Sequence, residues 1–230
     1  MFGFIETFYF VPLNPRVKQY VGEFLGTFFL VLVGTGAIVL NDYTQGRVTH
    51  LGISFAFGGV VTAMIYAFGK WSGAHINPAV TIAFWVGRKM ETKFVAPYLL
   101  FQLLGAFLAS IVLKIVFPDN ETLGATLPVA GITESAWIEF GLTAFLMLVI
   151  LVFSSTIEAL KPYAAIAIGT TVGLEAYFAG PYTGASMNPA RSIAPAVFSG
   201  QYEGIALYIF ATTIGAVLIA YTWNIIIKEA

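Results

Sequence analysis

One short stretch occurs twice in this chain and constrains its fold more than any other feature. Residues 72–80 and 183–191 each contain Gly-Ala, two variable residues, and then Asn-Pro-Ala. Asparagine is a strong N-cap, and proline suits the first turn of a helix because its φ is fixed and it has no N–H to satisfy. Each copy therefore predicts a loop that ends at the start of a helix.

The apolar run after each copy is too short to cross a membrane. We expect helices over about 77–87 and 188–198, and at 1.5 Å per residue each spans roughly 15 Å, half of a hydrocarbon core of roughly 30 Å. Two half-length helices in a membrane protein are typical of a pore. A third Asn-Pro, at Asn14-Pro15, lies in a polar flank without such a helix after it, and we interpret it as an ordinary turn.

The composition identifies an integral membrane protein. The chain is 58% hydrophobic and only 10% charged, whereas soluble domains carry about 25% charged residues. The net charge of −1 gives no reason to expect a nucleic-acid partner, and the absence of cysteine excludes disulfides and thiolate metal sites. Six apolar stretches are long enough to cross a bilayer, near 19–40, 50–69, 94–117, 136–157, 162–180 and 204–227.

The distribution of lysine and arginine predicts the orientation. With the N-terminus in the cytoplasm, two of the eleven basic residues, Arg47 and Lys114, fall outside, and Arg191 lies in neither set of loops. Cytoplasmic loops carry the excess of positive charge, so both termini are expected in the cytoplasm. The first Asn-Pro-Ala loop then enters from the cytoplasm and the second from outside. The short termini suggest a prokaryotic plasma membrane.

The two halves of the chain repeat each other beyond these loops. Glu23 and Glu139 each precede Thr and then Phe-Leu at the same spacing, early in the first span of each half. Each half has three spans, so the second half is inverted in the membrane. We therefore expect one channel domain over 1–230, made of inverted repeats at about 16–117 and 133–228, with its site near the midplane.

Together these features resemble the aquaporin, or major intrinsic protein, family over nearly the whole chain. The doubled Asn-Pro-Ala, Arg191 after the second copy and the inverted repeat carry the resemblance. Segment 180–192 is similar to plant nodulin-like intrinsic proteins and their prokaryotic relatives. The resemblance implies an all-α membrane protein, a right-handed bundle of six transmembrane helices plus two re-entrant half-helices, assembled as a homotetramer in the lipid bilayer.

The two asparagines are the first candidate site. Their amide groups can cap the half-helices and also donate to a passing water, and the positive ends of the two helix dipoles converge there and repel cations and hydronium. The alternative is that they only cap. The candidate pore residues are Asn77, Pro78, Ala79, Asn188, Pro189 and Ala190.

Arg191 is the second candidate site, because a charge at this depth is costly and usually functional. We expect its guanidinium to line a constriction, donate to solute oxygens and reject cations; a structural salt bridge is the alternative. The resemblance assigns the rest of this filter to Phe57, Ala176 and Ala185. Two alanines imply a wider opening than strict water channels have, whereas Ser192 and Ala196 match the water-channel pattern.

Four further polar residues lie in apolar surroundings. Glu23 and Glu139 are expected to accept hydrogen bonds from the re-entrant loop of their own half, whose backbone cannot stay unpaired in lipid. His75 is either a structural residue that bonds backbone carbonyls or a pore-lining, pH-sensitive one. Glu175, beside Ala176, could face a neighbouring helix, a subunit contact or the outer vestibule.

The sequence thus predicts a passive channel for water and small uncharged solutes such as glycerol, one that excludes protons and ions. The alternatives are a strict water channel or a channel for a metalloid hydroxide, urea or ammonia. An enzyme is not expected, because the chain has no Ser/His/Asp set or zinc-ligand cluster, and no cofactor or metal is implied. A coupled transporter would need a titratable or ion-binding group at the midplane, where this chain has uncharged asparagines. A structural junction protein with a closed pore would show no water or solute flux.

Overall fold

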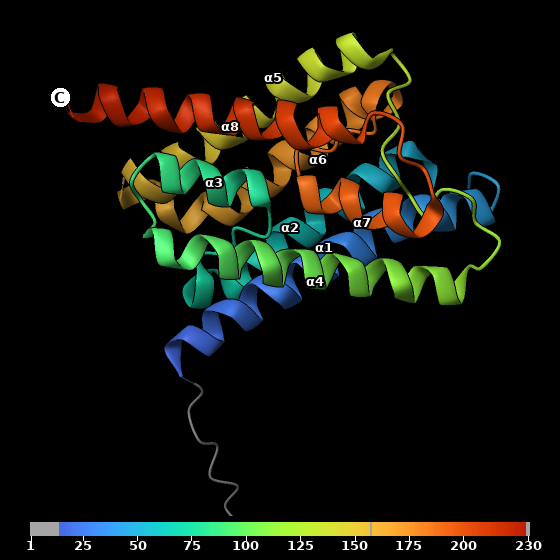
Figure 1. The fold of residues 1–230 in the computed structure, drawn as a ribbon, viewed down its shortest axis with the longest axis horizontal. Helices are drawn as coiled ribbons and strands as arrows, with labels where there is room; N and C mark the ends of the chain where they lie inside the picture. Colours follow the sequence, from blue (N-terminus) through green and yellow to red (C-terminus); the bar gives the residue numbers. More distant parts are fainter. Residues whose placement is uncertain (1–13, 157, 229–230) are drawn as a thin grey trace, which may run out of the picture.

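The computed structural model describes residues 14–156 and 158–228, and its long elements are all helices (Figure 1). In chain order they are α1 (Pro15–Tyr43), α2 (Thr49–Ser72), α3 (Pro78–Val86), α4 (Thr92–Val116), α5 (Ile132–Leu151), a π-helical turn (Val152–Thr156), a 3₁₀ helix (Glu158–Tyr163), α6 (Ala164–Thr183), α7 (Pro189–Ser199) and α8 (Ile205–Lys228). The predicted all-α membrane architecture is confirmed, and the described residues form six long α-helices and two short ones.

The two short helices, α3 and α7, begin where the doubled motif predicts. Asn77 caps α3 by accepting the N–H of Ala79, and Asn188 caps α7 by accepting the N–H of Ala190. Both short helices lie in the middle of the bundle, between α4 and α8 (Figure 1). Both helix starts are therefore buried inside the protein, where side chains of the chain itself must satisfy their N–H groups.

The interpretation of Asn14-Pro15 as an ordinary turn is wrong. The Asn14 side chain accepts the N–H of Arg16 at 2.9 Å, and Pro15 is the first residue of α1. The same capping chemistry therefore starts three helices in this chain, and only two of those helices are short. The Asn-Pro pair marks a helix start; the length of the apolar run that follows decides whether the helix spans.

Five of the described helices are long and apolar enough to cross a bilayer, namely α1, α2, α4, α5 and α8. Helix α6 has 20 residues, which is also sufficient length, but it contains Glu175 and several small and hydroxyl residues. The predicted span over 136–157 is shorter as an α-helix, because the backbone leaves α-geometry at Val152. A π-helical turn covers Val152–Thr156, and a 3₁₀ helix covers Glu158–Tyr163.

The two halves make matching contacts. Helix α1 packs on α4 as α5 packs on α8, and α2 packs on α6 across the centre. At that crossing a side chain on Gly58 would lie 2.7 Å from the carbonyl oxygen of Gly169, and one on Gly169 would lie 2.5 Å from that of Gly58. The two helices can therefore meet only where both lack a side chain, as expected for close packing in membranes.

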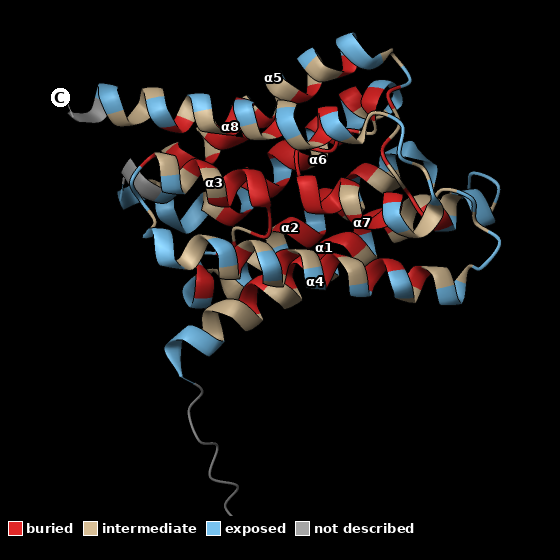
Figure 2. Ribbon diagram, in the orientation of Figure 1, coloured by how far each residue is buried: buried red, intermediate tan, exposed pale blue. Residues whose placement is uncertain are grey.

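Burial follows a membrane pattern, with small and polar residues inside and large apolar ones outside. Buried positions gather on α3, α7 and the inner faces of the long helices (Figure 2). Phe55, Ile115 and Trp137 are each more than 70% exposed on the outer surface. Such a surface suits contact with lipid, because lipid is as apolar as these side chains.

Candidate pore and its constriction

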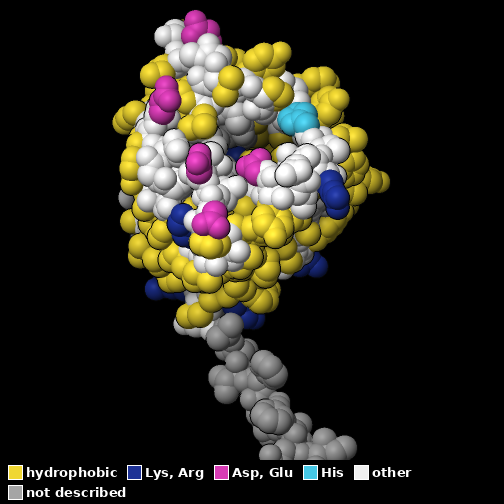
Figure 3. Space-filling view, turned by 90° about the vertical axis from the view of Figure 1, so that its right-hand side faces the viewer, with side chains coloured by type: hydrophobic (Ala, Val, Ile, Leu, Met, Phe, Trp, Pro, Cys, Tyr) yellow, Lys and Arg dark blue, Asp and Glu magenta, His cyan; other side chains and the backbone are white. Residues whose placement is uncertain are grey.

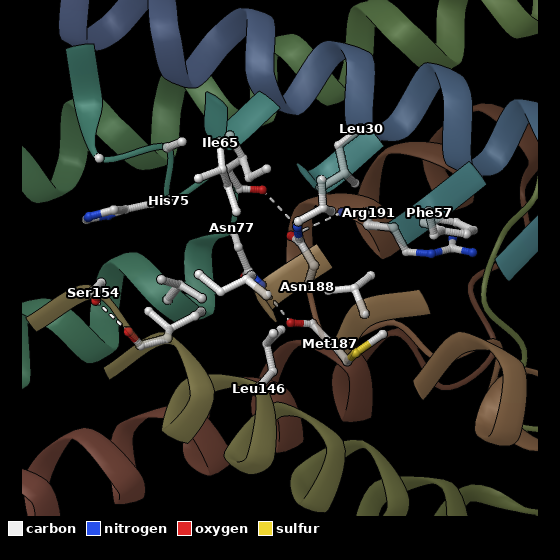
Figure 4. Close-up of a pocket in the computed structure, with 18 of the residues that line it drawn as sticks. Leu30, Phe57, Ile65, His75, Asn77, Leu146, Ser154, Met187, Asn188 and Arg191 are labelled. Atoms are coloured by element: carbon white, nitrogen blue, oxygen red, sulfur yellow. Dashed lines mark hydrogen bonds between the residues drawn. The ribbon is translucent and has the colours of Figure 1, made fainter. Parts of the chain in front are cut away.

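The two Asn-Pro-Ala motifs meet at the centre of the bundle. The Asn77 amide donates from Nδ2 to the carbonyl oxygen of Met187 at 2.8 Å, and the Asn188 amide donates to the carbonyl of Ile76 at 2.8 Å. Each asparagine thus caps its own half-helix with its oxygen and binds the opposite loop with its nitrogen (Figure 4). One N–H of each amide remains for a solute, because an amide nitrogen carries two.

The loops before these asparagines contain residues with positive φ. In this conformation the carbonyls of Ile76 and Met187 accept from the asparagine of the opposite motif. Ile76 and Met187 have φ of 45° and 54°, and Ala74 and Ala185 have φ of 46° and 43°. Left-handed backbone at non-glycine residues is uncommon and costs free energy, so it persists only where neighbouring groups hold it. The residues that hold it are the two buried glutamates.

Glu23 holds the first loop. Its carboxylate accepts the N–H groups of His75 at 3.0 Å and Ile76 at 2.7 Å. The Gln102 side chain of α4 donates to the same carboxylate at 2.7 Å and to the Thr81 hydroxyl of α3 at 2.9 Å. Glu23 has no exposed surface. The expected bonds from Glu23 to its own loop are confirmed.

Glu139 holds the second loop in the same way. Its carboxylate accepts the N–H groups of Ser186 at 2.8 Å and Met187 at 2.9 Å, and the Thr183 hydroxyl at 2.8 Å. It is also fully buried. The two acids therefore serve the same purpose in both halves, which is to satisfy loop amides that lipid could not.

A cavity of about 120 Å³ runs past the asparagines. Its wall is largely apolar, with Leu30, Val61 and Leu146 among its residues, and its polar groups come from Asn77, Asn188, His75, Ser154, Ser186 and Arg191. His75 and Arg191 lie on opposite sides of the asparagine pair (Figure 4). The Pro-Ala pairs of both motifs are buried behind the asparagines, Ala79 and Ala190 with no exposed surface.

The residues expected at the filter separate into two groups. Phe57, Ala185 and Arg191 line the cavity. Ala176 is buried but is not among the lining residues, and Val172, one turn earlier on α6, takes part in the wall. The assignment of Ala176 to the filter stays a prediction.

Arg191 is 1% exposed and makes no salt bridge in the described chain. Its Nη1 donates to the carbonyl oxygen of Gly124 at 2.7 Å, and its guanidinium carbon lies 5.1 Å from the centre of the Phe57 ring. Its Nε and Nη2 have no protein partner among the described residues. Two donors of this cavity-lining residue therefore have no protein partner, which favours solute binding over a structural ion pair.

His75 lies at the cavity, as one of its two interpretations expects, and its possible pH sensitivity stays a prediction. Its side chain lines the cavity, and its Nδ1 lies 3.1 Å from the Thr81 hydroxyl and not against a backbone carbonyl. The rings of Phe84 and Tyr98 flank it, with centroids at 4.7 and 5.2 Å. The imidazole is thus held at Nδ1 by a hydroxyl and flanked by two aromatic rings.

Glu175 lies inside the protomer. It is 7% exposed, and neither carboxylate oxygen has a hydrogen-bond partner in the described residues. Two of the locations left open for it, a subunit contact and the outer vestibule, are therefore wrong. Its electrostatic neighbour is Glu139 of the adjacent α5.

Sequence reasoning gave no hydrogen-bonding role to several polar residues that support the site. The Thr126 hydroxyl donates to Ser192 at 2.8 Å, and Ser192 in turn lies 2.6 Å from the Ser186 hydroxyl. Thr81 and Ser192 both stand four residues after a motif asparagine. That shared position is the signal that could have identified them, because it places both hydroxyls one turn inside a half-helix.

Comparisons with known proteins agree with this geometry. The chain is 40% identical over 213 residues to "Aquaporin NIP1-1" of Oryza sativa subsp. japonica, covering 92% of this chain and 75% of that one. It is 40% identical over 213 residues to "Nodulin-26" of Glycine max, covering 92% and 79%. The solved aquaglyceroporin of Plasmodium falciparum superposes with a TM-score of 0.82 at 26% identity, over 93% of this chain and 97% of that one.

These relatives come from plants and a protozoan parasite, and they give no support to the expected prokaryotic origin. The sequence profile "Major intrinsic protein" matches residues 13–223, nearly the full chain. With the paired asparagines, the half-helices and this match, the chain belongs to the major intrinsic protein family of multi-pass membrane channels for water and small uncharged solutes.

Proposed function

We propose that this channel passes glycerol as well as water, and excludes ions and protons. The observation that carries the proposal is the cavity at the asparagine pair, whose wall is apolar on most sides with a row of donors along it. Such a wall suits a solute with a carbon face and a hydroxyl face, because each face finds a matching partner. The relatives named for nodulin-26 and for aquaglyceroporin support this solute class.

Exclusion of charge follows from the two half-helices. The N-termini of α3 and α7 face each other at the asparagines, so the positive ends of both helix dipoles act on the same point of the passage. A water that accepts from both asparagines turns its hydrogens away, and the chain of water-to-water bonds is interrupted there. The positive potential repels cations and hydronium, whereas the oxygen of a neutral solute can accept a hydrogen bond there.

Arg191 and Phe57 form the narrow part of the passage in this proposal. The free Nε and Nη2 of Arg191 donate to solute oxygens, and the Phe57 ring faces the carbon side. Ala185, which also lines the cavity, adds little bulk to its wall. Ser192 and Ala196, which resemble the water-channel pattern, do not line the cavity, so they bear on its width only indirectly.

We further propose a single channel domain of two inverted repeats in a plasma membrane, assembled as a homotetramer, with both termini in the cytoplasm. The described chain starts and ends at the same end of the bundle (Figure 1). At the opposite end acidic side chains surround a hollow (Figure 3), and the exposed acids Asp42, Asp119, Glu121, Glu134 and Glu203 belong to its helix ends and connectors. The excess of lysine and arginine at the other end favours the cytoplasm there.

The Arg191→Val variant tests the assignment of the constriction. Valine is the residue that the first half has at the corresponding place, Val80, so the fold accepts it there. We expect the glycerol permeability to rise relative to that of water by about threefold or more, because a long charged side chain leaves the narrow part. Stopped-flow light scattering on vesicles that contain the purified chain measures both permeabilities.

Two outcomes of that experiment contradict the proposal separately. If vesicles with the unmodified channel take up glycerol no faster than protein-free vesicles, the protein is a strict water channel. If the permeability ratio is unchanged in the Arg191→Val variant, Arg191 is not part of the constriction, whichever solutes the unmodified channel passes.

A further inference from the structure

We infer that Gly34 of α1 is a specificity-determining residue, because its missing side chain leaves the space that the Phe57 ring occupies at the constriction. Gly34 acts as a positioning residue, since it is buried and does not line the cavity, whereas Phe57 does. The inference rests on the proposed function, because it assumes that the Phe57 ring borders the narrow part of the passage.

One face of α1 points toward the cavity. Gly26, Leu30 and Gly34 are four residues apart, so they lie on that face one above another. Leu30 lines the cavity, and a Cβ on Gly26 would overlap the Ile76 side chain of the first motif loop. A side chain on Gly34 would therefore point toward the passage, as that of Leu30 does.

The Phe57 ring fills the space that a side chain on Gly34 would need. A Cβ on Gly34 would overlap the ring edge, 2.5 Å from Cδ1 and 2.8 Å from Cζ. Carbon atoms in contact lie about 3.5–4.0 Å apart, so even a methyl group requires a shift of roughly 1 Å. The ring lies between α1 and the Arg191 guanidinium, whose carbon is 5.1 Å from the ring centre (Figure 4).

The ring takes up this shift, because the backbone of α2 is fixed beside it. Gly58, the residue after Phe57, packs on α6 so closely that a Cβ there would lie 2.7 Å from the carbonyl oxygen of Gly169. Two backbones in such contact leave α2 no room to adjust at this point. A side chain on Gly34 therefore turns the ring away from α1 and toward Arg191, which narrows the passage.

The second half of the chain uses other side-chain sizes at the same two positions. Counted from the buried glutamate of each half, Ile150 of α5 corresponds to Gly34. Counted back from the motif asparagine, Ile168 of α6 corresponds to Phe57. Both isoleucines line the cavity. The second half thus has two side chains of equal size, whereas the first half combines an aromatic ring on one helix with no side chain on the next.

Gly34→Ala is the principal test, measured by stopped-flow light scattering on vesicles that contain the full purified chain. We expect the ratio of glycerol to water permeability to fall by about threefold or more, because a narrower passage hinders the larger solute more. The water permeability itself is expected to fall by about twofold.

Gly36→Ala is the matched control. Gly36 lies two residues further along α1, and the closest atom to an added Cβ is Cδ2 of Leu113, at 3.3 Å. The substitution makes the same change to the same helix but does not meet the Phe57 ring. Both permeabilities are therefore expected to equal those of the unmodified channel.

A double variant separates positioning of the ring from general damage. In the Phe57→Leu background, Gly34→Ala is expected to change the permeability ratio no further, because the ring that it displaces is gone. Equal reductions by Gly34→Ala with and without the ring would overturn the inference, since they would mean that α1 itself has moved. Unchanged permeabilities in Gly34→Ala would also overturn it.

Two further outcomes are decided by the same variants. If the unmodified channel passes no glycerol, the proposed solute class is wrong, and water permeability alone tests Gly34. A loss of water permeability in Gly34→Ala that Phe57→Leu cancels then supports the inference, and its absence overturns it. If Gly34→Ala does not fold, the double variant decides: folding with the permeability ratio of Phe57→Leu supports the inference, and any other result overturns it.

Discussion

The Glu139→Leu variant is expected to melt about 10 °C lower than the unmodified channel in detergent. The change removes a fully buried acceptor and leaves three donors without a partner, from Ser186, Met187 and Thr183. A buried donor left unpaired costs about 1–3 kcal/mol, and breaking a buried charged network costs about 3–5 kcal/mol. For a chain of this length each kcal/mol shifts the melting temperature by roughly 2–4 °C.

Glu134→Leu is the control for this prediction. Glu134 lies in the first turn of the same helix, α5, but it is exposed. Its loss is expected to change stability by no more than about 1 kcal/mol, through the helix dipole. Water permeability should also fall in Glu139→Leu, because Met187 presents its carbonyl to Asn77 only while its own N–H is held. A melting curve like that of Glu134→Leu would contradict the role assigned to Glu139.

The doubled motif made most of this architecture predictable. An Asn-Pro pair predicts where a helix begins, because asparagine caps the first N–H groups and proline fits the first turn. The predicted starts of α3 and α7 therefore lie within a residue or two of Pro78 and Pro189. The glutamates followed from a physical requirement, since loop amides inside a membrane need an acceptor. In contrast, Asn14 shows the limit of the motif, because capping chemistry alone does not say how long a helix will be.

The sequence could not show the contacts between residues that lie far apart in the chain. The bond from Arg191 to Gly124 joins a side chain to a backbone carbonyl. Every residue has such a carbonyl, so the sequence does not indicate which one accepts the bond. The crossed bonds of Asn77 and Asn188 depend on the left-handed backbone of the opposite loop. One of the two interpretations of His75 gave it backbone carbonyls as partners, whereas in the structure the Thr81 hydroxyl of α3 lies beside its Nδ1.

Replacing Glu175 by methionine is expected to stabilise the channel. The carboxylate is buried, both oxygens lack a protein partner in the described chain, and Glu139 acts on it as a like charge. Burying a polar group without compensation costs about 1–3 kcal/mol. The first half shows what the fold accepts here, because the corresponding residue of α2 is Met64, which packs against the apolar core.

We therefore expect Glu175→Met to melt roughly 5 °C above the unmodified protein, with about 1–3 kcal/mol gained. Glu175→Gln is the matched variant: it keeps the shape and removes the charge, but it still buries an unpaired polar group, so its gain should be smaller. Permeability to water and glycerol should stay the same in both, because Glu175 does not line the cavity. A lower melting temperature for Glu175→Met than for Glu175→Gln would contradict this prediction. It would mean that the side chain of Glu175 has a stabilising polar partner behind the pore wall.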